Sequence, residues 1–156
     1  MTKKDLALTF FQQGYSCSQA VLAPFAEDFG LSRELAFKVA GGFGGGMGRM
    51  AETCGAVTGA MMVLGLKFGA VQGNDRAGKE KACERVRELM RQFKARHQTF
   101  VCRELLGCDI STERGWARAR EKNVHVTQCP QYVGDAAEIV ERLITEPPVP
   151  GAAQAV

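Results

Sequence analysis

Apolar residues recur at the spacing of an α-helix along almost the whole chain, and this periodicity excludes most folds. They lie three and four positions apart, whereas no alternating run is long enough for a strand. Ser16 and Ser32 suit helix N-caps, and Gly14 and Gly30 suit helix ends. We expect the main helices over residues 5–13, 16–29, 54–68, 74–97 and 130–144. The sequence therefore predicts an all-α fold, a single-domain bundle of about six or seven helices with a glycine-rich loop.

Length and charge exclude several classes of protein. With 156 residues, of which 46% are hydrophobic, the chain is long enough for one domain with a core. The formal net charge is only +3 and basic residues lie among acidic ones, so we expect no nucleic-acid partner. The most apolar segment, 60–70, is too short to cross a bilayer, and the N-terminus lacks a signal-peptide pattern. We therefore expect a cytoplasmic protein with a domain over 1–145, no membrane partner and a disordered tail over 146–156.

Six cysteines are many for a chain of this size in a reducing compartment, where static disulfides are rare. Such cysteines are more often catalytic, redox-cycling, metal-binding or buried. Four of them lie where a helix is expected to begin, namely Cys17, Cys54, Cys102 and Cys129. Unpaired backbone N–H groups and the helix dipole stabilise a thiolate at that position. We expect these four residues to converge on one site as redox or ligand thiols.

The remaining cysteines and the two histidines are less informative. Cys83 lies within a long helical segment and is expected to be a small core residue. Cys108 follows a glycine, and the sequence leaves open whether it joins Cys102 or is simply buried. His97 and His125 fall at helix ends or loops and are expected at the surface.

The segment GGFGGGMGRMAETCGAVTG, residues 41–59, has eight glycines among nineteen residues and surrounds Cys54. Glycine allows backbone conformations that other residues avoid, so this loop can direct N–H groups toward an anion or cofactor beside the thiol. The candidate cofactor-binding residues are Gly44, Gly45, Gly46, Gly48, Arg49 and Gly55. Alternatively, the glycines serve only close helix packing, since Gly55 and Gly59 share one helical face. A phosphate loop is excluded, because no Gly-Lys-Ser/Thr follows and no strand precedes.

Four blocks occur in this order along the chain: GYSCSQAVL, GGFGGGMGRMAETCGAVTGAMMVLGL, CRELLGCDIST and CPQYVGDAAEIV. They resemble the C_GCAxxG_C_C family, which is named for its cysteine pattern and described as redox-active. The resemblance extends from about residue 6 to residue 143 and implies a small helical bacterial protein whose family cysteines are the same four. Pro24 departs from the family's usual helix, and it should kink that helix or leave a hydrogen bond unmade.

A domain related to this family occurs in a multihaem cytochrome in which an iron–sulfur cluster accompanies the haems. The resemblance therefore adds an iron–sulfur cluster to the candidate cofactors. The chain has no Cys-x-x-Cys-His sequence, so we expect no covalently bound haem.

Three interpretations of the four thiols stay open. In the first, the thiols cycle between dithiol and disulfide with an unknown redox partner, although no Cys-x-x-Cys pair is present. In the second, they hold an iron–sulfur cluster or, less favoured without short ligand spacings, zinc. In the third, they are buried small residues of a non-enzymatic helical binding module. A homodimer is also compatible with the glycine-faced helix.

Overall fold

The computed structural model describes residues 1–147, and its named elements in this part are all helices, as the periodicity predicts. Its elements in chain order are α1 (Lys3–Gln12), α2 (Cys17–Ala26), the 3₁₀ turn η1 (Glu27–Phe29), α3 (Arg33–Ala40), α4 (Gly55–Phe68), α5 (Arg76–His97), α6 (Cys102–Leu106), α7 (Glu113–Glu121), α8 (Val124–Thr127) and α9 (Cys129–Thr145). Most of the predicted tail, residues 148–156, lies outside the described residues, so its disorder stays a prediction.

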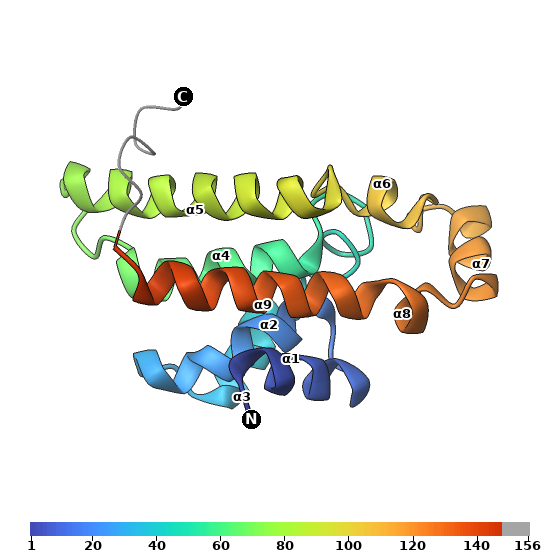
Figure 1. The fold of residues 1–156 in the computed structure, drawn as a ribbon, viewed down its shortest axis with the longest axis horizontal. Coiled ribbons are helices and arrows are strands. Elements are labelled where there is room, and N and C mark those ends of the chain that lie inside the picture. Colours follow the sequence, from blue (N-terminus) through green and yellow to red (C-terminus); the bar gives the residue numbers. More distant parts are fainter. Residues whose placement is uncertain (148–156) are drawn as a thin grey trace.

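Helix α4 lies at the centre of the bundle and contacts α2, α5 and α9. Figure 1 shows the long helices α5 and α9 side by side, with α1, α2 and α3 as a layer below them and α6, α7 and α8 gathered at one end. Small and aliphatic residues such as Ala56, Val57, Ala60 and Val63 are completely buried along α4. This composition allows helices to approach α4 from several directions, because no large side chain holds them apart.

The helix starts follow the capping residues that the sequence offers. Ser16 forms a capping box with Gln19 at the start of α2, which saturates two backbone N–H groups. Pro24 lies inside α2 without ending it, and α2 stops at Ala26 and continues as the 3₁₀ turn η1 to Phe29. The predicted helix 16–29 is therefore divided into two elements. The four-residue helix α8 was not expected at all.

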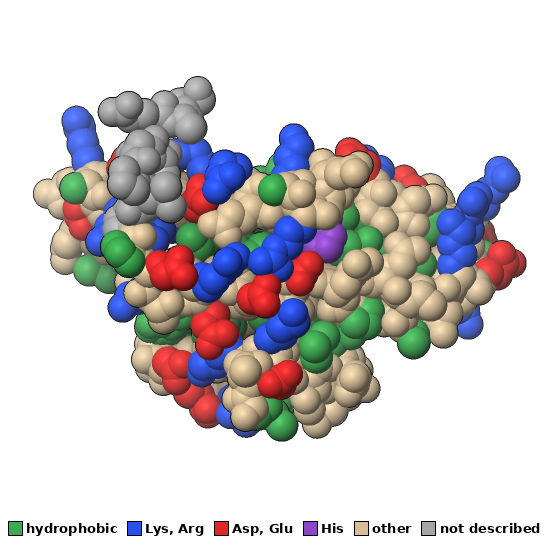
Figure 2. All heavy atoms as spheres, in the orientation of Figure 1, with side chains coloured by type: hydrophobic (Ala, Val, Ile, Leu, Met, Phe, Trp, Pro, Cys, Tyr) green, Lys and Arg blue, Asp and Glu red, His purple; other side chains and the backbone are tan. Residues whose placement is uncertain are grey.

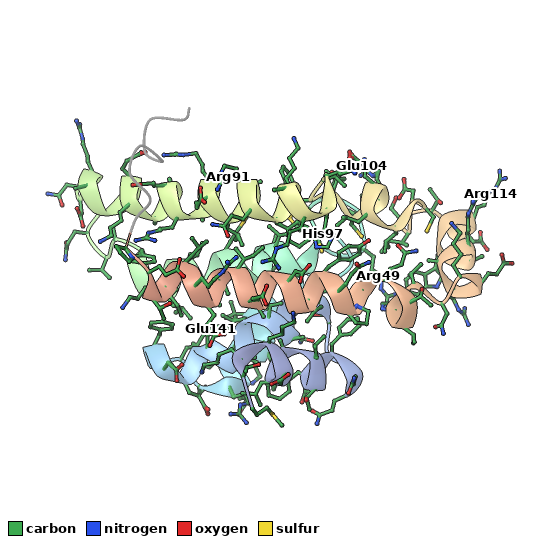
Figure 3. All side chains as sticks on the ribbon, viewed as in Figure 1. Arg49, Arg91, His97, Glu104, Arg114 and Glu141 are labelled. Carbon is green, nitrogen blue, oxygen red and sulfur yellow. The ribbon has the colours of Figure 1, made fainter. Side chains whose placement is uncertain are left out.

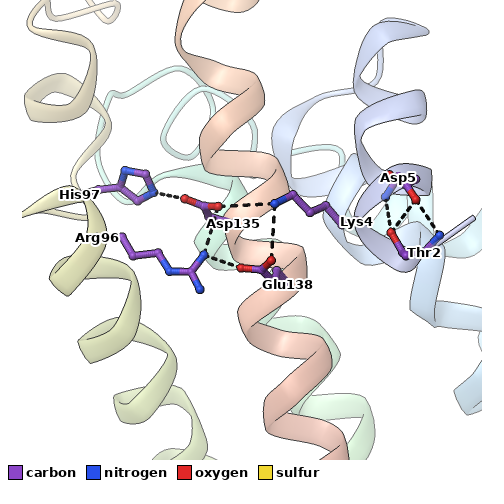
Figure 4. A network of polar contacts seen from close by, with 7 residues as sticks. All are labelled: Thr2, Lys4, Asp5, Arg96, His97, Asp135 and Glu138. Carbon is purple, nitrogen blue, oxygen red and sulfur yellow. Dashed lines mark hydrogen bonds and ion pairs between the residues drawn. The ribbon is translucent and has the colours of Figure 1, made fainter.

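Charged side chains of both signs alternate over the face formed by α5 and α9 (Figure 2). On this face three basic side chains surround the carboxylate of Asp135 in α9 (Figure 4). Its oxygens lie 2.9 Å from His97 Nε2, 3.1 Å from Arg96 Nη1 and 3.9 Å from Lys4 Nζ. Glu138 adds an ion pair to Arg96 at 2.6 Å. The network therefore joins α1, α5 and α9.

The packing of α5 corrects two expectations about which side chains are buried. The side chain of His97 is only 10% exposed, because its ring lies against Phe93 and Tyr132, with centroid distances of 4.6 and 5.0 Å. Cys83, expected in the core, is exposed instead. The buried arc of α5 includes Leu89 and Phe93, and Cys83 projects outside this arc.

None of the helices within residues 1–147 combines the length and the apolar character that crossing a bilayer requires.

Candidate functional site

Four helices begin around one cavity, and each carries a cysteine at or immediately before its first residue. Cys17, Cys102 and Cys129 are the first residues of α2, α6 and α9, and Cys54 is the N-cap of α4. All four line a cavity of about 240 Å³. Every cysteine of the chain is a free thiol. The structure thus gathers, on four separate helices, the four cysteines that the sequence placed at helix starts.

Close packing of α2 on α4 brings Cys17 next to the start of α4. A Cβ atom at Gly59 would lie 2.6 Å from the carbonyl oxygen of Ser18, and one at Gly55 would lie 3.1 Å from Cβ of Cys17. Real side chains do not approach so closely, so glycine is required at Gly59. The glycine face therefore does serve close helix packing, and this packing positions a thiol.

A single β-bridge fixes Cys54 relative to Cys102. Thr53 pairs with Val101, the N–H of Cys54 donates to the carbonyl oxygen of Phe100 at 2.8 Å, and the N–H of Cys102 donates to that of Glu52 at 2.6 Å. Side chains alternate along extended backbone, so those of Cys54 and Cys102 lie on the same side of the bridge.

The glycine-rich loop forms one wall of the cavity through Gly45 and Gly46. Gly46 has a φ of +73°, and a Cβ atom there would lie 2.5 Å from the backbone nitrogen of Glu52. No other residue fits this position. Within residues 1–147, the N–H groups of Gly45 and Gly46 have no hydrogen-bond acceptor. These two donors are therefore free to meet a bound group.

The outer part of the loop differs from the expectation that its N–H groups face a ligand. The N–H of Gly48 donates to the carbonyl oxygen of Gly42 at 2.8 Å. The N–H of Arg49 donates to the carbonyl oxygen of Gly44 at 3.2 Å. These hydrogen bonds close the loop on itself. Gly48 and Arg49 therefore offer no backbone donor, although both residues line the cleft described below.

Cys129 is the thiol of the cavity that ionises most readily. Interaction with the Cys17 thiol lowers the pKa of Cys129, burial opposes this effect, and interaction with His125 lowers the pKa further, to about 6 from an ordinary 9.0. The same interaction between Cys17 and Cys129, together with burial, raises the pKa of Cys17 well above 9.0. Contact with Cys129 raises the pKa of His125. Cys129 therefore holds the negative charge, and Cys17 holds the proton between them.

Cys54 and Cys102 stay protonated at neutral pH. Burial raises the pKa of Cys54 to about 11, although the N–H groups of Ala56 and Val57 oppose this rise. Burial and the neighbouring thiols raise the pKa of Cys102 to about 12. A helix start alone does not produce a thiolate here, because removal of the sulfur from water outweighs the helix dipole. The expectation of a thiolate at all four helix starts is met at Cys129 only.

Sequence reasoning missed His125, which is exposed at the surface as expected but also lines the cavity. It precedes Cys129 by four residues, a spacing that places two side chains on one face of continuous helix. That spacing was the available signal, and it was overlooked because α8 was not expected. The apolar wall formed by Ile110, Trp116 and Tyr132 also had no sequence signal, because these residues come from separate helices and loops.

A wider cleft, of about 950 Å³, adjoins the thiol cavity. Cys17, Ile110, Trp116 and His125 line both spaces, so the cleft gives access to the thiols from outside. The proposed cofactor residues are divided between the two spaces. The cavity is lined by Gly45, Gly46 and Gly55, and the cleft is lined by Gly44, Gly45, Gly48 and Arg49.

Comparison with known families identifies the cysteine pattern. The family model described as "Putative redox-active protein (C_GCAxxG_C_C)" matches residues 15–143. The chain belongs to the C_GCAxxG_C_C family. The matched segment contains all four cavity cysteines and His125. No curated protein and no solved structure matches this C_GCAxxG_C_C protein.

The donor set of the C_GCAxxG_C_C cavity is suited to soft metals, since it consists of four thiols. In the part of the chain that the structure describes, however, no three Cys, His, Asp or Glu side chains converge so as to hold a metal ion. Tetrahedral zinc requires such convergence, and the arrangement does not fit it. The thiols instead surround a space.

Proposed function

We propose that this protein is a thiol–disulfide redox protein in which Cys129 is the attacking thiolate and Cys17 is the second thiol of the pair. The proposal is carried by the cavity that Cys17, His125 and Cys129 line together, where its two neighbours lower the pKa of Cys129. Thiolates, and not thiols, attack disulfides. With a pKa of about 6, Cys129 is mostly ionised at neutral pH, whereas an ordinary cysteine is mostly protonated.

Each of the three side chains has a separate part in this chemistry. Cys129 supplies the nucleophilic sulfur. Cys17 lines the same cavity as that sulfur and closes an intramolecular disulfide with it. His125, whose pKa is raised by Cys129, is the acid that gives a proton to a departing thiolate. Cys54 and Cys102 keep their protons and line the remaining cavity wall.

Disulfide mapping tests this proposal. The reduced protein, carrying Cys83→Ser to remove the exposed thiol, is treated with a limiting amount of disulfide oxidant and digested, and the linked peptides are identified by mass spectrometry. We expect a Cys17–Cys129 crosslink as the first product. Oxidation that reaches Cys54 or Cys102 first, or that gives only crosslinks between chains, would contradict the proposal.

A second function, binding of an iron–sulfur cluster, is favoured by one observation. Four thiols on four helices line a single cavity, and two N–H groups in its glycine wall have no acceptor within residues 1–147. Cys17, Cys54, Cys102 and Cys129 would hold the cluster, and backbone N–H groups beside its sulfides would tune its potential. Such a cluster would supply one-electron transfer.

Anaerobic purification distinguishes the two functions. The ultraviolet–visible spectrum, iron content and sulfide content are measured on the same sample. Broad visible absorption with stoichiometric iron and sulfide supports the cluster. A colourless protein that contains no iron and forms the Cys17–Cys129 disulfide supports thiol redox and contradicts the cluster.

A further inference from the structure

The cleft beside the thiol cavity has the dimensions of a site for a small molecule. Its volume of about 950 Å³ lies within the range of small-molecule sites, whereas the thiol cavity of about 240 Å³ is too small for most such ligands. Because Cys17 and His125 line both spaces, a molecule in the cleft lies next to the reactive pair. The cleft is therefore the route by which a substrate reaches Cys129.

The ionisable side chains that line the cleft and the thiol cavity include basic residues and no carboxylates. The basic residues are Arg49, Arg120 and His125, and no Asp or Glu is among the lining residues. This bias is local, since the chain as a whole has 20 basic and 17 acidic residues. A cleft lined by one sign of charge raises the local concentration of ligands of the opposite sign.

Arg49 is held in place at the cleft. Its guanidinium carbon lies 4.6 Å from the ring centroid of Trp116, and its backbone has a φ of +62° fixed by the hydrogen bond to Gly44. Within residues 1–147, Arg49 makes no ion pair with a carboxylate, and its guanidinium remains available to a ligand. Figure 3 shows Arg49 near the start of α9, the helix that begins with Cys129.

We propose that this cleft binds low-molecular-weight disulfides that carry carboxylates, with Arg49 binding a carboxylate and the disulfide bond lying toward Cys129. This inference rests on the proposed function and adds the class of substrate. Arginine binds carboxylates through two parallel hydrogen bonds, which orient the ligand as well as attract it. The aromatic rings of Phe11, Tyr15 and Trp116 supply apolar contact for the uncharged part of the ligand.

The reaction transfers two electrons from the protein to the disulfide. The Cys129 thiolate attacks one sulfur of the substrate, the substrate S–S bond breaks, and a mixed disulfide forms. The departing thiolate takes a proton from His125. The Cys17 thiol then loses its proton to solvent and attacks the Cys129 sulfur, which closes the Cys17–Cys129 disulfide and releases the second substrate thiolate, which takes a proton from solvent. The substrate leaves as two thiols, and the protein dithiol is oxidised to one disulfide.

Three disulfides of different charge test the inference on the full chain carrying Cys83→Ser. They are oxidised glutathione, which is anionic, bis(2-hydroxyethyl) disulfide, which is neutral, and cystamine, which is cationic. The rate at which each disulfide consumes the free thiols of the protein is measured. This rate is divided by the rate at which the same disulfide reacts with a small free thiol, so that the intrinsic reactivity of the disulfide cancels. We expect the normalised rates to fall in the order anionic, neutral, cationic, and we expect the anionic rate to decrease with ionic strength.

Arg49→Asn is the decisive variant, because asparagine tolerates a positive φ better than most residues. We expect it to lower the ratio of the anionic rate to the neutral rate roughly tenfold, the loss of one charged hydrogen-bond pair. Arg49→Lys keeps the charge and should restore part of the ratio. Arg114→Asn makes the same change on α7, outside both spaces (Figure 3), and should leave the ratio unchanged.

Failure of the inference differs from failure of the proposed function. If oxidised glutathione and the neutral disulfide react at equal normalised rates, and Arg49→Asn does not change their ratio, the cleft does not select anions and the inference is overturned alone. If no disulfide oxidises the protein, the proposed function is overturned and the inference with it.

Discussion

Cys17 and Cys129 begin helices that are far apart in the chain, yet they line the same cavity and shift each other's pKa in opposite directions. Two thiols that interact in this way share a proton, and their surroundings decide which sulfur is charged. Here interaction with His125 lowers the pKa of Cys129, so the charge is held on Cys129. The position of the charge within the pair therefore depends on a third residue, and this dependence can be tested.

The first prediction concerns the pH dependence of alkylation at Cys129. The pKa of Cys129 is lowered to about 6, so the thiolate persists as pH falls from 9 and is lost only near pH 6. The rate of reaction with iodoacetamide, followed at this residue by mass spectrometry, should therefore reach half its maximum near pH 6. A midpoint at or above pH 8 would contradict the assignment.

The role of His125 is tested by the same profile. His125→Asn removes the imidazole that lowers the pKa of Cys129, so the midpoint should move to higher pH. Lys122→Asn removes an exposed positive charge from the segment before α8 and lines neither the cavity nor the cleft. It should leave the midpoint in place. Equal midpoints in the two variants would show that general surface charge, and not His125, sets the pKa.

A second prediction tests whether the Cys17 thiol lowers the pKa of Cys129 as a hydrogen-bond donor. Cys17→Ser keeps an O–H donor toward Cys129, whereas Cys17→Ala removes the donor. The pKa of Cys129, measured from the ultraviolet absorbance of its thiolate, should rise more in the alanine variant than in the serine variant. Neither variant can form the Cys17–Cys129 disulfide. Coinciding pKa values would mean that the contact does not act as a hydrogen bond.

Much of the fold was predictable from local signals. Helical periodicity, together with Ser16, Ser32 and Asp75 as N-caps, gave helix starts close to those observed. The boundaries moved where tertiary contacts compete with local preference. The helix expected from residue 54 begins at Gly55 with Cys54 as its N-cap, and the preceding Thr53 is held in the bridge to Val101.

The site was predictable in its cysteines and not in their chemistry. Helix starts are local features, so Cys17, Cys54, Cys102 and Cys129 could be found from the sequence. The depth at which each sulfur is buried depends on the packing of all helices. This depth keeps Cys54 protonated, and the sequence contains no local signal for it. The same is true of the cleft, which is assembled from residues that are distant in the chain.

A third prediction concerns the contact between α2 and α4. In Gly59→Ala the added methyl group would lie 2.6 Å from the Ser18 carbonyl oxygen, so the helices must separate. We expect a loss of about 1–3 kcal/mol in the free energy of unfolding, measured by urea denaturation. The separation should also weaken the contact that holds Cys17, and the alkylation midpoint of Cys129 should rise.

Gly65→Ala is the matched control on the same helix. Nothing lies within 4 Å of a Cβ atom at Gly65, so this substitution should be neutral or stabilise the protein by up to about 1 kcal/mol through helix propensity. Equal effects of the two substitutions would show that α2 does not approach α4 as closely as described.

The fourth prediction concerns Asp135, the carboxylate that joins three helices (Figure 4). Asp135→Asn weakens its contacts with His97, Arg96 and Lys4 at a position where the side chain is only 24% exposed. We expect the free energy of unfolding to fall by about 1–2 kcal/mol, less at high salt. Glu34→Gln removes one partner of the exposed Lys38 pair and should cost no more than about 0.5 kcal/mol.

The comparison of these two variants also reports on the cavity. His97 lies edge-on against Tyr132, whose hydroxyl donates to the Leu105 carbonyl oxygen and whose ring lines the thiol cavity. If the network supports this wall, Asp135→Asn should increase the alkylation rate of the buried Cys102 in the folded protein, because local opening exposes its thiol. Glu34→Gln should not change that rate. A loss of stability in Asp135→Asn without faster reaction at Cys102 would mean that the network stabilises the bundle but does not support the cavity wall.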